Sequence, residues 1–72
     1  MLIDEILEYV LDYNGHVTKA ELSVKFGLQT NRKTQLAFEF CVRYGLLEET
    51  SLEYKMPQSV QRWLREIRAQ EG

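Results

Sequence analysis

The residues best able to do chemistry lie in one short polar stretch, TNRKTQ, at positions 30 to 35. It contains Arg32 and Lys33, and it stands directly before the apolar stretch LAFEF at positions 36 to 40. This order places two cations in the first turn of an expected helix, where the helix dipole disfavours positive charge by up to about 1 kcal/mol. An anion bound at this helix end would turn the same two cations into favourable contacts.

Length and composition limit the chain to one small domain. Of its 72 residues, 44% are hydrophobic and 28% are charged, an ordinary globular mixture. Cys41 is the single cysteine, which excludes a disulfide framework and indicates a reducing compartment, most simply the cytoplasm. No apolar run approaches the roughly 18 residues of a membrane span, and the acidic start MLIDEILEY is unlike a signal or transit peptide. We therefore expect a single cytoplasmic domain over residues 1–72 that has no contact with a membrane.

The net charge of −2 does not by itself indicate a nucleic-acid-binding protein. The distribution of charge along the chain is more informative, because cations outnumber acids in residues 30–45 and 57–72, whereas acids outnumber cations in the rest of the chain. Such an asymmetry can matter more to a binding partner than the total charge.

Apolar spacing predicts four helices and one β-hairpin. The helices cover residues 2–14, 19–26, 31–44 and 57–69, and the hairpin covers residues 46–56. The pair Asn14-Gly15 ends the first helix, because these residues accept positive φ. Thr18 and Glu21 form a capping box for the second helix, with the Thr18 hydroxyl accepting from the Glu21 amide and Glu21 accepting from the Thr18 amide.

The third helix is expected to be the central one. Thr30 is its preferred cap, with Asn31 as the alternative. Its polar residues form a single stripe of Arg32, Gln35, Glu39 and Arg43. Because the other residues from Leu36 to Tyr44 are apolar or aromatic, we expect most of its circumference to be buried. The residues expected in the core include Phe26, Phe38, Phe40, Cys41 and Tyr44.

After Gly45 the pattern changes to two short strands joined by a polar turn. The segment His16-Val17 can form a link or a single strand pairing. Pro57 is expected as the first residue of the last helix, and residues 69–72 are expected to fray. The fold class is therefore mostly α with a small β-hairpin.

The run TKAELSVKFGLQTNRKTQLAFEFCVRYGLLEE, positions 18 to 49, resembles the winged helix-turn-helix family. With the first helix, the resemblance covers residues 2–56. It implies a winged helix-turn-helix domain with an additional C-terminal helix. One departure is visible: the link between Gly27 and the third helix is about one residue longer than the commonest family version.

In such a domain the start of the second motif helix enters the major groove of double-stranded DNA. Arginine can bind guanine, and asparagine or glutamine can pair with adenine. Threonine, lysine and free helix amides can hold phosphate. The resemblance therefore implies DNA binding by Thr30, Asn31, Arg32, Lys33, Gln35 and, less directly, Arg43, in a small homodimeric transcriptional regulator.

Two other interpretations of this surface stay open. The cations can be a plain solvated face, or the domain can be a protein-interaction module of a larger assembly, since the same fold serves both DNA and protein binding. The hairpin favours the second alternative over DNA, because Glu48, Glu49 and Glu53 outnumber Lys55 and would repel phosphate.

The C-terminal helix offers a second candidate surface. The apolar residues Val60, Trp63, Leu64 and Ile67 can fold back on the first helix or form a dimer or partner interface. The row Arg62, Arg65 and Arg68 is a solvated face or a second phosphate contact.

An enzyme is not expected from this inventory of residues. The sequence has no phosphate-binding glycine loop, no metal-ligand cluster and no nucleophile with a base at readable spacing. His16 stands alone, so a structural or solvated role is expected. We therefore predict no catalytic residue, no metal and no cofactor.

Overall fold

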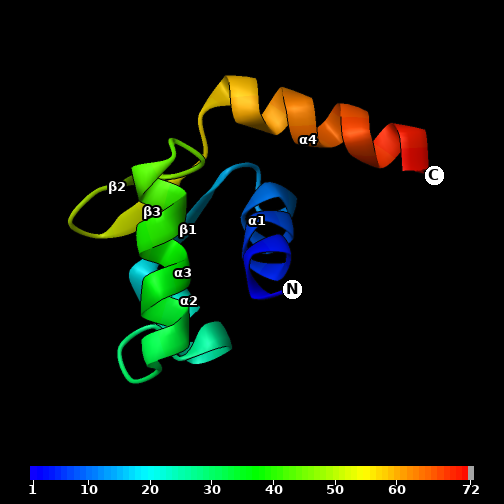
Figure 1. Cartoon of the computed structure of the whole chain (residues 1–72). Coiled ribbons are helices and arrows are strands. Elements are labelled where there is room, and N and C mark those ends of the chain that lie inside the picture. Colours follow the sequence, from blue (N-terminus) through cyan, green and yellow to red (C-terminus); the bar gives the residue numbers. More distant parts are fainter. Residues whose placement is uncertain (72) are drawn as a thin grey trace.

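The computed structural model describes residues 1 to 71, which form four helices and three short strands (Figure 1). In chain order these are α1 (Leu2–Asp12), β1 (His16–Thr18), α2 (Lys19–Phe26), α3 (Arg32–Arg43), β2 (Glu48–Glu49), β3 (Glu53–Lys55) and α4 (Gln58–Glu71). The prediction of a mostly helical domain with a small antiparallel hairpin is confirmed.

The sheet has three strands, because β1 joins the hairpin. The strand order is β1-β3-β2, and both pairings are antiparallel. Val17 lies opposite Tyr54 in the β1–β3 pair, and Glu49 lies opposite the same tyrosine in the β2–β3 pair. The segment between α1 and α2 is thereby hydrogen-bonded to the hairpin. This single strand pairing was one of the two alternatives predicted for His16-Val17.

One apolar core joins the sheet to the first three helices. Its members include Ile6 and Val10 of α1, Leu22 of α2, and Phe38 and Cys41 of α3, each at most 1% exposed. Phe38 and Tyr54 pack ring against ring with centroids 4.7 Å apart, so α3 is fixed to the middle strand of the sheet. The side of α3 that meets this core is only one face of the helix.

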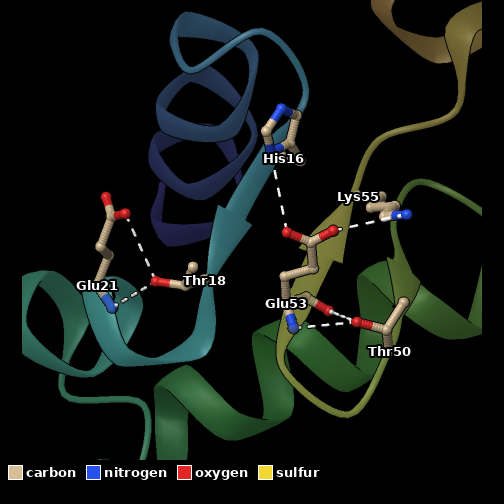
Figure 2. Close-up of polar contacts among 6 residues, drawn as sticks. All are labelled: His16, Thr18, Glu21, Thr50, Glu53 and Lys55. Atoms are coloured by element: carbon tan, nitrogen blue, oxygen red, sulfur yellow. Dashed lines mark hydrogen bonds and ion pairs between the residues drawn. The ribbon is translucent and has the colours of Figure 1, made fainter.

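The start of α2 follows the predicted capping box in part. Thr18 Oγ1 accepts a hydrogen bond from Glu21 N at 3.2 Å, as predicted. The Glu21 carboxylate, however, accepts from the Thr18 hydroxyl at 3.5 Å and not from the Thr18 amide (Figure 2). Thr18 is also the last residue of β1, paired with Glu53, so its backbone belongs to the sheet.

The prediction that Thr30 caps α3 is wrong, and Asn31 is the cap. Asn31 Oδ1 accepts from Lys33 N at 3.0 Å and from Thr34 N at 3.4 Å, two amides of the first helical turn. Thr30 instead closes the turn before the helix, with its N–H donating to Gly27 O at 3.0 Å. The longer link noted in the sequence therefore moves the cap one residue along the chain.

The second helix has the predicted bounds, and each of the other three differs from its predicted bounds by one or two residues at one or both ends. The first helix ends at Asp12, and Asn14 (φ 62°) and Gly15 (φ 92°) then form the expected left-handed stop. The third begins at Arg32 and ends at Arg43. Pro57 lies just before α4, not inside it, and its carbonyl accepts from Gln61 N at 3.0 Å.

The last helix is joined to the core by its first half only. Val60 and Leu64 pack against the core, and Gln61 is 5% exposed with Nε2 donating to Met56 O at 2.9 Å. Figure 1 shows the C-terminal turns of α4 extending away from the rest of the chain. The helix continues to Glu71, two residues beyond the predicted end at residue 69, and Gly72 lies outside the described residues.

Candidate functional site

The outward face of α3 exposes several large apolar side chains. Leu36 is 48% exposed, Phe40 is 43% exposed and Tyr44, which follows the last turn, is 64% exposed. The prediction that Phe40 and Tyr44 lie in the core, and that α3 is buried on most of its circumference, is wrong. The core meets only the opposite face, formed by Thr34, Ala37, Phe38 and Cys41.

These three side chains form one continuous row. They are spaced at four residues, so they lie on the same side of the helix and span about 12 Å along its axis at 1.5 Å per residue. The Phe40 and Tyr44 rings are in contact, with centroids 4.6 Å apart and planes inclined by 43°. Beside the row is a shallow hollow of about 290 Å³, lined by Leu36, Glu39, Phe40, Arg43 and Tyr44.

Cations lie before the first residue of this apolar row and beside its last residue. Arg32 and Arg43 are three helical turns apart on the same side of α3, about 16 Å along the axis, and Lys33 is next to Arg32. None of these three has a carboxylate of the described residues within ion-pairing distance, whereas Lys19, Lys55 and Arg68 each have one. We call the row and its flanking cations the α3 face: Arg32, Lys33, Leu36, Phe40, Arg43 and Tyr44.

Three of the predicted DNA-contact residues, Asn31, Arg32 and Gln35, make local side-chain hydrogen bonds. The Asn31 side-chain oxygen is taken by the two helix amides that it caps. The bidentate pairing of an asparagine with adenine needs that oxygen as well as the nitrogen. Gln35 is half-buried; its Nε2 donates to Gln29 O at 3.3 Å, and its Oε1 accepts from Arg32 at 3.5 Å. Thr30, Arg32, Lys33 and Arg43 are exposed, as expected.

The hairpin presents an acidic surface. Glu49 accepts from Lys19 Nζ at 2.8 Å and from the Tyr54 hydroxyl at 3.4 Å. In Figure 2 the Glu53 carboxylate lies between His16 (3.8 Å) and Lys55 (3.5 Å), and Thr50 closes the turn by accepting from Glu53 N at 3.0 Å. His16 is thus exposed beside a carboxylate. Glu48 is exposed with no cation of the described residues within ion-pairing distance, so this surface would repel phosphate.

Buried titratable groups are held in their neutral forms. Burial raises the pKa of the Cys41 thiol to about 11, so the thiolate is scarce at neutral pH. Burial, together with Glu49, raises the pKa of Tyr54 to about 12. Among residues 1–71, no group of three or more His, Cys, Asp or Glu side chains is placed to hold a metal ion.

The prediction of burial was wrong for the apolar members of the α3 face. Their spacing carries a usable signal, because Leu36, Phe40 and Tyr44 fall on the same side of the helix as Arg32 and Arg43.

No helix of the described residues has the length and apolar character needed to cross a membrane. No family model, no curated protein and no solved structure matches this chain.

Proposed function

We propose that this domain is a winged-helix interaction module that binds a partner protein on the α3 face. The order of its elements supports the winged-helix assignment, with the pair α2–α3 followed by the β2–β3 hairpin and β1 paired to β3. The same fold serves both DNA and protein binding, so the surface chemistry has to decide between them.

The exposed apolar row on α3 is the observation that carries the proposal. Leu36, Phe40 and Tyr44 occupy the middle of the surface that a DNA-binding helix would place against polar base edges and phosphates. Aromatic residues and arginine are the types enriched in protein interfaces and in their energetic hot spots. The α3 face combines both, with Phe40 between Arg32 and Arg43 and Tyr44 directly after Arg43.

The charges on this face specify the partner's chemistry. Its three cations lack carboxylate partners in the described chain, and Glu39 is the acid that lies beside them. The complementary partner is an amphipathic segment with apolar residues along one side and Asp or Glu at both ends of that side. Burying Leu36 and Phe40 would supply affinity, and the ion pairs would set orientation.

DNA binding is the second candidate, and one observation favours it. Arg32 and Lys33 lie exposed at the N-terminus of α3, with no carboxylate of the described residues within ion-pairing distance, in a place where they oppose the helix dipole unless an anion binds. The acidic hairpin and the engaged Asn31 and Gln35 side chains count against it.

A display selection would test the proposal. Random peptides are selected on the native domain and counter-selected on the Leu36→Gln/Phe40→Gln variant. We expect a consensus of apolar residues at helical spacing flanked by acids. The chosen peptide should lose affinity at least about 30-fold on the variant, the effect of removing a hot spot worth about 2 kcal/mol.

Val24→Gln/Leu52→Gln is the matched control, because these apolar side chains are 90% and 76% exposed on other elements. It should bind the peptide as the native domain does. Fluorescence anisotropy with random duplex DNA at low and moderate salt forms the second arm. DNA binding that weakens with salt and disappears in Arg32→Ala/Lys33→Ala, without any peptide consensus, would replace our proposal with the DNA-binding function.

A further inference from the structure

We propose that the groove between α1 and α4 is a self-association site, filled by α4 of a second copy of this chain. The groove has a volume of about 570 Å³. Its apolar walls are formed by Ile3 and Leu7 of α1 and by Trp63 and Ile67 of α4. This surface is separate from the α3 face, so the inference does not depend on the function proposed above.

The extent of exposed surface is the first argument for an occupant. The chain exposes 5064 Å², whereas a compact monomer of 8.5 kDa exposes about 4,650 Å². The excess agrees with the placement of α4, whose C-terminal turns extend beyond the body in Figure 1. Trp63 is 54% exposed on this helix, although its ring is the largest apolar group of the chain. An α4 packed against a second copy would cover this surface.

Charge identifies that occupant as α4. The α1 wall of the groove carries Asp4 and Glu8, and Glu8 has no cation of the described residues within ion-pairing distance. The helix α4 carries Arg62 and Arg65, which likewise have no carboxylate partner among those residues. A second copy therefore brings a basic helix with an exposed tryptophan to an apolar groove with an acidic wall.

The proposed contact also produces a closed dimer with two-fold symmetry. Each copy offers the same groove and the same helix, so α4 of one copy lies against α1 of the other in two equivalent contacts. Within each copy Arg68 Nη1 is 3.0 Å from Asp12 Oδ1, so α4 is also joined to the C-terminal end of α1.

Trp63 makes the test direct, because it is the only tryptophan. Its fluorescence and the mass from sedimentation equilibrium are followed up to about 1 mM protein, where even a Kd of 1 mM leaves half of the chains paired. We expect a mass of twice 8.5 kDa and a blue shift of the emission as dimer forms. Trp63→Ala should raise the dimer Kd about 30-fold or more, with circular dichroism showing that the helices persist.

A pair of charge reversals tests the orientation. Glu8 lines the groove and Glu5 of the same helix does not. Glu8→Arg should raise the dimer Kd roughly tenfold at low salt because it faces the partner's basic helix, and Glu5→Arg should leave it unchanged. A monomeric mass at 1 mM would overturn the proposal, as would a dimer that neither Trp63→Ala nor Glu8→Arg weakens. A dimer that is lost only in Leu36→Gln/Phe40→Gln would place the contact on the α3 face instead.

Discussion

Single side chains decide where α3 begins, and Asn31 has the larger effect. Its oxygen accepts hydrogen bonds from two amides of the first turn, whereas Thr30 belongs to the preceding turn. We expect Asn31→Ala to lower the free energy of unfolding by about 1 kcal/mol, the usual cost of a lost cap. Thr30→Ala should change it by less than about 0.5 kcal/mol. Urea denaturation followed by circular dichroism measures both, and the opposite order would restore Thr30 as the cap.

Cys41 is a residue whose burial could be predicted from the sequence. Its place in the apolar run of the third helix predicted a core position, and the structure gives it no exposure and a raised pKa. Phe40, one residue earlier, has an equally apolar side chain and lies in the same run, yet it is 43% exposed. Composition cannot separate such neighbours, because only the packing of α1 and the sheet decides which face of α3 is covered.

At the scale of elements, turn chemistry was readable but contacts distant in sequence were not. The stop at Asn14-Gly15 and the Thr18 cap follow from residue types alone, and the structure has them where expected. The pairing of β1 with β3 joins residues 16–18 to residues 53–55. Nothing local to either segment specifies that pairing, because strands of three residues carry little pattern of their own.

The junction between the end of α1 and the start of α4 depends on one such distant contact. A Cβ added at Gly15 would lie 2.2 Å from Gln61 Nε2 and 2.6 Å from its Cδ, and the backbone φ of +92° disfavours any L side chain. We expect Gly15→Ala to lower the free energy of unfolding by at least about 1–3 kcal/mol. Urea titrations of the single and double variants with Gln61→Ala measure the share due to the clash.

In that double-mutant cycle, Gln61→Ala by itself removes the hydrogen bond to Met56 O and should destabilise the domain. If the clash matters, the double variant will be more stable than the sum of the single effects predicts. Strict additivity would mean that backbone strain at Gly15 alone accounts for the cost.

At the scale of the whole molecule, the two proposed surfaces belong to different parts of the chain. The α3 face lies on the helix packed against the sheet, and the α1–α4 groove is lined by residues of α1 and α4. Figure 1 shows the C-terminal turns of α4 extending from the body. Each presents large apolar side chains beside charges that lack partners in the described chain. A small domain has little stability to spare, so this combination favours the interpretation that each surface binds a partner. Composition and net charge indicate neither surface, whereas the spacing of apolar residues in the last helix had predicted Trp63 and Ile67 as part of a dimer or partner interface.

If both proposals hold, the dimer carries two α3 faces and should bind a repeated partner by avidity. A peptide with two copies of the selected sequence, joined by a flexible linker long enough to reach both faces, should bind at least about tenfold more tightly than the single copy. Trp63→Ala should abolish this gain and leave the affinity for the single copy unchanged, because the variant keeps its α3 face as a monomer. Isothermal titration calorimetry with the two peptides measures affinity and stoichiometry together. An equal gain in the Trp63→Ala variant would show that avidity does not require the α1–α4 groove.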